Sequence, residues 1–217
     1  MINACVFDLD GTLLNSLKDI ANTTNYVLQK NGFPQWDLDQ YRDFVCDGLP
    51  TLLQRALAEN YSPEIIMHLA DDFTAYYNQH YNDFTVPYAE VPELLNNLLR
   101  HGMKIAVLSN KPDHFVKIII EEMYPGVDFS LIQGKTDKFP QKPDPASLIN
   151  LLEELQVSPD QALYIGDSNV DVYTAHNAGL KVVGVTWGFR ERSELEEAGA
   201  DYIVDSPDDI LRIVNAN

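Results

Sequence analysis

The sequence contains few cysteines and no long apolar run, and both absences narrow the kinds of protein it can encode. Cys5 and Cys46 are the only cysteines among 217 residues, too few for a disulfide framework, and they match no zinc-ligand pattern. No apolar run approaches the ~18 residues that a membrane-spanning helix requires. The first residues, INACVF, are typical of a strand and not of a secretory signal peptide, which begins with basic residues. We therefore expect a cytoplasmic protein without membrane partners.

Positive charge is also scarce. The chain has 15 lysines and arginines against 33 aspartates and glutamates, a net charge of -18 at pH 7. Such a surface repels a phosphate backbone, so the composition argues against nucleic acid as a partner. It also repels small anions at long range. An anion site must therefore carry local positive charge from a lysine, a helix N-terminus or a metal ion.

Strand and helix patterns alternate over most of the chain. Short, continuous apolar runs, typical of strands buried on both faces of a parallel sheet, occupy residues 2–7, 103–108, 162–165, 182–185 and 202–204. Helical patterns lie between them, at 94–102, 147–155 and 170–180. This alternation predicts an α/β protein with a doubly wound, Rossmann-like, mostly parallel sheet.

Residues 16–82 interrupt the alternation, because they contain helical patterns and prolines but no convincing strand. A connection between a strand and the next element of an α/β unit normally takes only a few residues. We therefore expect a small all-helical cap domain of residues 16–82, inserted after the first strand. The α/β core domain would comprise residues 1–15 and 83–217, with hinges near 14–18 and 82–88.

Polar residues follow three of the predicted strands. Asp8 ends the first strand, Ser109 and Asn110 end the second, and Asp167 ends the third. Ligands of open α/β sheets bind at the carboxyl ends of the strands, so we expect these side chains to meet in one crevice. Lys142, in the loop QKPDP, would join them from the start of a helix.

The expected crevice is rich in carboxylates. Asp171 follows Asp167 by one helical turn, and the alternation of side chains makes Asp8 and Asp10 point the same way. One lysine, Lys142, cannot balance four neighbouring negative charges. A hard divalent cation can, and an all-oxygen ligand set favours Mg²⁺. The residues thus predict a magnesium site made by Asp8, Asp10, Asp167 and Asp171.

Four segments together resemble the motifs of the haloacid dehalogenase-like hydrolase superfamily. DLDGT at 8–12 resembles its first motif, Ser109 its second, Lys142 its third and GDSNVD at 166–171 its fourth. The segments VPELLNNLLRHGMKIAVLSNKP, QKPDP and GVTWGFR are similar to the phosphoglycolate phosphatase-like branch of that superfamily. Ala89-Glu90 departs from that branch, which usually has a proline-glycine pair there.

The resemblance implies a mechanism. Asp8 would be the nucleophile that forms an aspartyl-phosphate, and Asp10, oriented by Thr12, would be the general acid and base. The resemblance implies that the ligands of the magnesium ion would be Asp8, the backbone carbonyl of Asp10, and Asp167.

The resemblance also implies the groups that bind the substrate. Ser109, the Asn110 amide and Lys142 would hold the phosphoryl oxygens, where charge develops. Asp171 would orient Lys142 or a metal-bound water, although a helix-start carboxylate is its simpler reading. The cap would set specificity through a loop at 41–53 with Gly48 at its turn.

The resulting hypothesis is a Mg²⁺-dependent phosphatase of small phosphate monoesters, a monomer or homodimer, with 2-phosphoglycolate as the leading substrate. Inorganic pyrophosphatase, nucleotidase and sugar phosphomutase are alternatives within the superfamily. A phosphonate hydrolase would need a cap lysine, for which Lys18 and Lys30 are available. A non-enzymatic module that binds a phosphorylated ligand is the remaining alternative, but Asp8 and Asp10 are both present.

Six further residues receive simpler interpretations. Lys111 follows the phosphate loop, where it could attract substrate, but we expect it to be a surface charge. We expect Tyr76, Tyr77 and Tyr81 to pack in the core or between cap helices. Arg42 is interpreted as part of an ordinary surface or cap salt bridge, with binding of a substrate carboxylate as the alternative. Arg190 lies near the carboxyl edge of the sheet, but substrate contact is the less favoured reading for it.

Overall fold

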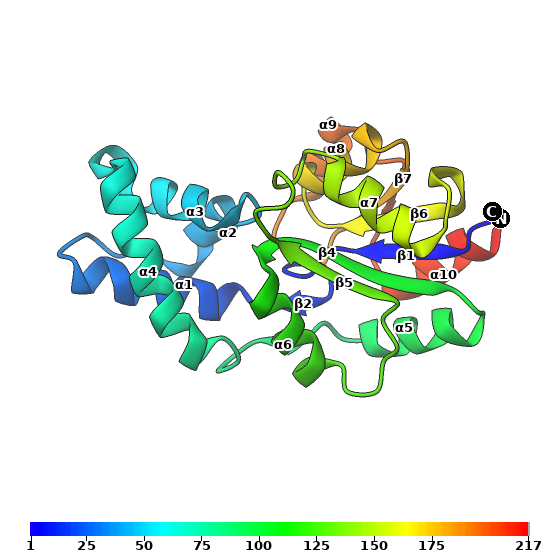
Figure 1. The fold of residues 1–217 in the computed structure, drawn as a ribbon, viewed down its shortest axis with the longest axis horizontal. Coiled ribbons are helices and arrows are strands. Elements are labelled where there is room, and N and C mark those ends of the chain that lie inside the picture. Colours follow the sequence, from blue (N-terminus) through cyan, green and yellow to red (C-terminus); the bar gives the residue numbers. More distant parts are fainter. Residues whose placement is uncertain (217) are drawn as a thin grey trace.

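The computed structural model describes residues 1–216 and contains a six-stranded sheet flanked by helices (Figure 1). All five strand pairings within this sheet are parallel. In order across the sheet the strands are β5 (Leu131–Lys135), β4 (Lys104–Pro112), β1 (Ala4–Phe7), β6 (Ala162–Gly166), β7 (Lys181–Val185) and β8 (Tyr202–Val204). The predicted doubly wound, mostly parallel α/β fold is confirmed.

Strand β1 lies at the centre of the sheet, between β4 and β6. Phe7 pairs with Val107 on one side and with Ile165 on the other. The residues that follow these three positions therefore lie at one edge of the sheet. The sequence missed β5, because LIQGK is half-buried and interrupted by Gln133 and Gly134, so it forms no apolar run.

Helices cover both faces of the sheet. Cys5 and Phe7 belong to one buried cluster, whereas Ala4 and Val6 belong to another, as expected for side chains that alternate along a strand. On the first face lie α5 (Val91–Arg100), α6 (Asp113–Met123) and α10 (Pro207–Ala216). On the second face lie α7 (Ala146–Leu155), α8 (Asn169–Asn177) and α9 (Arg192–Ala198).

Helix α5 shows why these residues fold as they do. Val91, Leu94, Leu95 and Leu98 recur at helical spacing and are all buried, so one face of the helix packs on the sheet. Its N-cap residue, Glu90, has a left-handed φ of 66°, a conformation that favours glycine. Glu90 stands where the related branch usually has the glycine of a proline-glycine pair, and a glycine would adopt this φ with less strain.

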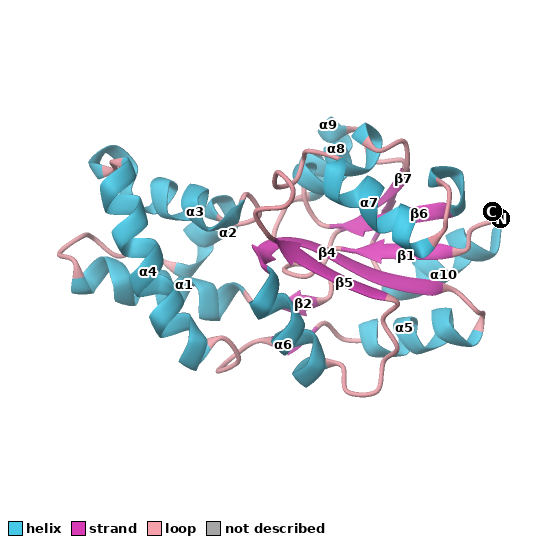
Figure 2. Ribbon diagram, viewed as in Figure 1, coloured by secondary structure: helices cyan, strands magenta, loops and turns pink. Residues whose placement is uncertain are grey.

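Residues 16–82 contain helices but no strand, and they lie beyond the carboxyl ends of β1 and β4 (Figure 2). The α-helices are α1 (Leu17–Lys30), α2 (Tyr41–Phe44), α3 (Gly48–Leu57) and α4 (Pro63–His80), and the short 3-10 helices are η1 (Leu38–Gln40) and η2 (Ala58–Asn60). Ser62 caps the N-terminus of α4, because its hydroxyl accepts a hydrogen bond from the Ile65 N–H, and Pro63 is the first residue of the helix. We call this helical group the cap, and its boundaries as a domain stay a prediction.

Two chain segments connect the cap to the core. They form a short antiparallel pair, β2 (Leu14–Asn15) and β3 (Val86–Pro87). Asp19, buried at the start of α1, accepts hydrogen bonds from the backbone N–H groups of Phe84 and Thr85 and from the Thr85 hydroxyl. Because a buried carboxylate is costly without such partners, Asp19 holds the two connections side by side.

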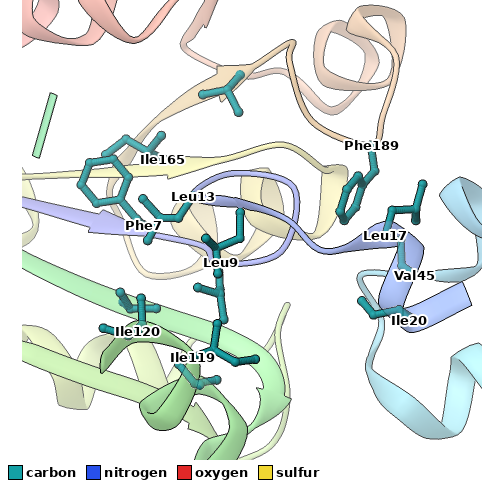
Figure 3. Close-up of a cluster of buried hydrophobic side chains, with 14 of the residues drawn as sticks. Phe7, Leu9, Leu13, Leu17, Ile20, Val45, Ile119, Ile120, Ile165 and Phe189 are labelled. Carbon is teal, nitrogen blue, oxygen red and sulfur yellow. The ribbon is translucent and has the colours of Figure 1, made fainter. Parts of the chain in front are cut away.

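The hydrophobic core extends from the sheet into the cap. Phe7 and Ile165 of the sheet belong to the same buried cluster as Leu17, Ile20 and Val45 of the cap, shown in Figure 3. The cap thus packs against the core through apolar contacts, and the cavity described below lies between them.

Among residues 1–216, no helix is long and apolar enough to cross a membrane.

Candidate active site

Three carboxylates meet at the edge of the sheet. Asp8 follows β1, Asp167 follows β6, and Asp171 lies in the first turn of α8. One oxygen from each lies within 4.8 Å of the others, and all three residues are buried. The predicted convergence of distant acidic residues is thus present in the structure.

Lys142 is the cation of this cluster. Its ammonium lies 2.9 Å from Asp8 Oδ1 and 2.7 Å from Asp171 Oδ1, and it donates to the Tyr164 hydroxyl at 3.1 Å. Burial alone would lower the pKa of Lys142, but Asp171 and Asp8 raise it well above its usual value. Lys142 is therefore held as an ammonium beside Asp8.

Asp171 is fixed by contacts with its own helix and with Lys142. Its Oδ2 accepts hydrogen bonds from the Ser168 backbone N–H and hydroxyl, which forms a capping box at the start of α8. Its Oδ1 faces Lys142. Both oxygens are thus engaged, which favours the orienting role expected for Asp171 over direct metal ligation.

Charge in the cluster is not balanced by protein groups. Burial raises the pKa of Asp8 to about 7, with Lys142 opposing the shift and Asp171 adding to it. Burial also raises the pKa of Asp167, and the Asp171 and Asp8 carboxylates raise it further. Lys142 alone does not compensate three buried carboxylates, whereas a divalent cation would. The donor set, all carboxylate oxygen, fits a hard divalent cation.

Asp167 is positioned by the loop after β7. The Phe189 N–H donates to Asp167 Oδ2 at 2.7 Å. Gly188 allows this approach, because a Cβ there would lie 2.3 Å from Asp167 Cβ and 2.5 Å from the Gly11 carbonyl oxygen. Gly11 has a φ of 89°, the left-handed conformation that favours glycine.

Asp10 lies outside the three-carboxylate cluster and has other partners. The Ser16 hydroxyl donates to Asp10 Oδ1 at 2.5 Å, and the Lys111 ammonium donates to both Asp10 oxygens at 2.9 and 3.1 Å. Thr12, which we expected to orient Asp10, instead donates to Asp167 Oδ1 at 3.5 Å. Ser16 and Lys111 therefore replace Thr12 as the groups that orient Asp10.

The interpretation of Lys111 as a surface charge is wrong. Its side chain is 5% exposed and forms an ion pair with Asp10. Burial opposes its charge, but the Asp10 carboxylate and the Tyr77 side chain raise the pKa of Lys111 above its usual value. The sequence signal was its place directly after Ser109-Asn110. In the structure β4 continues to Pro112, beyond the predicted end at residue 108, and so includes Lys111.

A cavity of about 70 Å³ lies between the core and the cap. Its core side, which we call the floor, consists of Asp8, Asp10, Ser109, Asn110, Lys111, Pro112 and Phe115. Its cap side, which we call the roof, consists of Ile20, Val45, Cys46, Gly48, Leu49, Leu52, Phe73 and Tyr77. The cavity therefore combines a polar, charged floor with a mostly apolar roof, as is common for small-molecule sites.

Three core side chains hold three successive carbonyls of the cap. Arg190 donates to the Val45 carbonyl at 3.1 Å, Asn110 to the Cys46 carbonyl at 3.0 Å, and Gln141 to the Asp47 carbonyl at 3.1 Å. These bonds come from strand β4 and from two separate loops of the core, so they fix the cap segment 45–47 against the floor.

Asn110 uses its side chain for this docking and for Lys142. Its Nδ2 donates to the Cys46 and Lys142 carbonyls, and its Oδ1 accepts from the Lys142 N–H. Its side-chain amide is therefore fully engaged. A contact of Asn110 with phosphate stays a prediction for its backbone N–H.

Arg42, Arg190 and Gly48 also lie at the cap–core boundary. Arg42 donates across it to the Gly188 carbonyl at 3.3 Å, so it is more than a pair within the cap. Arg190 pairs with Asp43 and Glu194, and it does not line the cavity, which agrees with the reading against substrate contact. Gly48 lines the cavity with a φ of 79°, as expected for the turn of the cap loop.

Sequence reasoning did not single out Ser16, Tyr164, Ser168 or the 188–189 loop. Ser168 carried a readable signal, because serine three residues before Asp171 matches a capping box. Tyr164 carried none, and the 188–189 loop carried only its place in the segment GVTWGFR, since both join the site through tertiary contacts with Lys142 and Asp167.

The fold and the site can be compared with those of known enzyme families. A model of the haloacid dehalogenase-like hydrolase family matches residues 5–185. The chain belongs to the haloacid dehalogenase-like hydrolases, and the resemblance found in its motifs is confirmed.

Individual relatives narrow the branch. The chain is 34% identical to the phosphoglycolate phosphatase of Vibrio parahaemolyticus over 98% of its own length and 96% of that protein. A structure from Haemophilus somnus, described as a predicted phosphoglycolate phosphatase, matches with a TM-score of 0.89 and 32% identity over 98% of this chain and 97% of that one. A predicted phosphatase from Clostridium acetobutylicum matches over 100% of both chains with a TM-score of 0.91 and 29% identity. The branch expected from the sequence is confirmed by the Vibrio relative, which carries the name phosphoglycolate phosphatase.

Proposed function

We propose that this chain is a Mg²⁺-dependent phosphatase of small phosphate monoesters and that 2-phosphoglycolate is its main substrate. The class of enzyme, a phosphoric monoester hydrolase, is confirmed by the family and by the curated relatives. The particular substrate is supported by the name those relatives carry and by the small size of the cavity. The cytoplasmic location and the monomeric or dimeric state stay predictions from the sequence.

One observation supports the chemistry most directly. Asp8 opens into the cavity beside Lys142, while Asp10 faces the same cavity with its own cation, Lys111. Two carboxylates with separate partners in one pocket suit two different roles, one as nucleophile and one as acid and base.

In the first half of the reaction, an Asp8 oxygen attacks phosphorus and an aspartyl-phosphate forms as the ester bond breaks. Asp10 in its protonated form gives its proton to the leaving oxygen. Lys142 and Ser109 hold phosphoryl oxygens where negative charge increases. A bound Mg²⁺, held by Asp8, Asp167 and the Asp10 carbonyl, would reduce the repulsion between Asp8 and the phosphoryl group.

In the second half, Asp10 accepts a proton from the water that attacks the aspartyl-phosphate. Phosphate leaves, and Asp8 returns as a free carboxylate. Ser16 and Lys111 keep Asp10 at the same place for both proton transfers. Asp171 acts only through Lys142, whose ammonium it holds beside Asp8.

The structure removes support from one alternative. A phosphonate hydrolase needs a cap lysine in the cavity, but Lys18 lies over the Phe84 ring and Lys30 pairs with Asp72. Neither lysine lines the cavity.

A panel of phosphorylated metabolites, assayed for phosphate release with Mg²⁺ and with a chelator, tests the proposal. We expect 2-phosphoglycolate to give the highest kcat/KM and the chelator to abolish turnover. Preference for pyrophosphate or nucleotides would reject the substrate but keep the class of enzyme.

The Asp8→Asn variant tests the mechanism. Without the nucleophile, kcat should fall by at least about 10³-fold while the fold is retained, as judged by circular dichroism. Near-normal turnover by this variant would reject an aspartyl-phosphate on Asp8.

A further inference from the structure

The roof of the cavity contains a buried polar group for which the catalytic scheme has no role. Tyr77 of α4 is 1% exposed and lines the cavity. Within residues 1–216 its hydroxyl makes no hydrogen bond of ordinary geometry, and its charged neighbour is Lys111. An unpaired buried hydroxyl costs about 1–3 kcal/mol, so a ligand atom in the cavity would supply the missing bond. The packing role expected for Tyr77 accounts for its ring but not for its hydroxyl.

The floor places a cation beside this hydroxyl. The Lys111 ammonium lies 4.9 Å from the centre of the Tyr77 ring. It donates to both oxygens of Asp10. An ammonium has three donor protons, so the third is directed to the Tyr77 hydroxyl oxygen or to a ligand, and the hydroxyl keeps its own proton to donate. Lys111 and Tyr77 therefore offer two donors to the same part of the cavity.

The order of charged groups along the floor indicates which part of a substrate would meet these donors. Asp8 marks the place of the phosphoryl group, and Asp10 marks the ester oxygen to which a proton is given. Lys111 contacts Asp10, whereas Lys142 contacts Asp8. Lys111 therefore lies on the side of the leaving group, close to the atoms that follow the ester oxygen.

We propose that Lys111 and Tyr77 form a subsite for a carboxylate carried one carbon from the ester oxygen, so that the leaving group is a short 2-hydroxy acid. In this subsite Lys111 pairs with the carboxylate and the Tyr77 hydroxyl donates a hydrogen bond to it. The inference rests on the proposed function and gives it a structural basis for substrate choice.

A carboxylate fits this subsite better than a second phosphoryl group does. The remaining walls are apolar and are formed by Ile20, Leu49, Leu52, Phe73 and Phe115. A carboxylate has two oxygens and one charge, which match two donors and one cation. A phosphoryl dianion would leave an oxygen and a charge against apolar walls, at a large desolvation cost, because Asp10 already neutralises much of Lys111.

The decisive experiment compares 2-phosphoglycolate with ethyl phosphate, which has the same ester linkage but no carboxylate. In Tyr77→Phe, kcat/KM for 2-phosphoglycolate should fall about tenfold, the effect of losing one hydrogen bond to a charged group. Ethyl phosphate lacks the group that Tyr77 recognises. The ratio of the two kcat/KM values should therefore fall by nearly the same factor.

Tyr76→Phe is the matched control. Tyr76 is the neighbouring tyrosine of α4, but it stacks on Tyr26 and His80 and does not line the cavity. The same chemical change outside the cavity should leave the substrate ratio unchanged.

A binding measurement separates recognition from turnover. In Asp8→Asn, calorimetry should show 2-phosphoglycolate binding about tenfold more tightly than in Asp8→Asn/Tyr77→Phe. Equal affinity in the two proteins would overturn the subsite. So would an equal loss of kcat/KM for both substrates, or a loss confined to pyrophosphate, which would indicate a phosphoryl subsite.

Failure of the proposed function would look different. A wild-type enzyme that does not prefer 2-phosphoglycolate to ethyl phosphate contradicts the proposed substrate before any variant is made. A wild-type preference that survives Tyr77→Phe contradicts only the subsite.

Discussion

The floor and the roof of the cavity differ in how their polar groups are used. On the floor, Asp8 and Asp10 each have a lysine partner, and Lys142 and Asp171 are further bonded to each other. On the roof, the cap supplies mostly apolar side chains, the orphan hydroxyl of Tyr77 and backbone carbonyls that core residues hold.

This difference separates two tasks. A network of buried charges holds its members at fixed places, because any displacement leaves a charge unpaired. An apolar roof selects substrates by shape and by a few polar groups, and its residues can change without disturbing the charges below. We therefore expect floor substitutions to affect kcat and roof substitutions to affect mainly KM and selectivity.

The largest effect should come from Lys142→Met. Removing the buried cation leaves Asp8 and Asp171 facing each other, so kcat should fall about 10³-fold and the free energy of unfolding by about 3–5 kcal/mol. Steady-state kinetics and urea unfolding measure the two effects. Lys138→Met, an exposed lysine of the same loop, should change neither. Wild-type stability in Lys142→Met would show that the floor is not a coupled network.

Gly188→Ala should act on the floor through Asp167. The added Cβ would lie 2.3 Å from Asp167 Cβ, so this carboxylate must move. The Mg²⁺ concentration for half-maximal activity should rise about tenfold, as for other changes around metal ligands. Gly32→Ala is a suitable control, because it makes the same chemical change at a glycine whose Cβ position has open space. Its only cost is the backbone strain of a φ of 78°. Equal metal requirements in the two variants would contradict the role of Gly188.

On the roof, Leu52→Ala should separate binding from chemistry. Leu52 is buried and lines the cavity, so its truncation should cost about 2–4 kcal/mol of stability and enlarge the cavity. KM for 2-phosphoglycolate should rise about fivefold at nearly constant kcat, which is the pattern for lost uniform binding. Ile149→Ala, at an exposed position of α7, is the control. A fall in kcat as large as that of Lys142→Met would remove the distinction between roof and floor.

The smallest effect should come from Gln141→Ala, which removes one of the three bonds that hold the cap segment 45–47. Because one neutral hydrogen bond contributes about 1 kcal/mol, KM should rise about threefold to fivefold with little change in kcat. Gln54→Ala, at an exposed position of α3, should leave KM as it is. An unchanged KM in Gln141→Ala would mean that Arg190 and Asn110 suffice to dock the cap.

Much of the architecture was readable in the sequence because it depends on local patterns. Continuous apolar runs marked five of the six sheet strands, and the lack of such runs marked residues 16–82 as helical. Strand β5 escaped detection, since a half-buried edge strand needs no continuous apolar run. The carboxylates at strand ends were readable for the same reason, because parallel strands end at one edge.

The sequence by itself determined the sheet, the helical insertion and the convergence of Asp8, Asp167 and Lys142, since each follows from residue periodicity and strand ends. Only the tertiary structure decided that Lys111 is buried against Asp10, that Thr12 faces Asp167, and that Tyr77 lines the cavity with its hydroxyl buried. The physical reason is that a side chain's partner is set by how separate elements pack in space, and no short stretch of sequence contains that information.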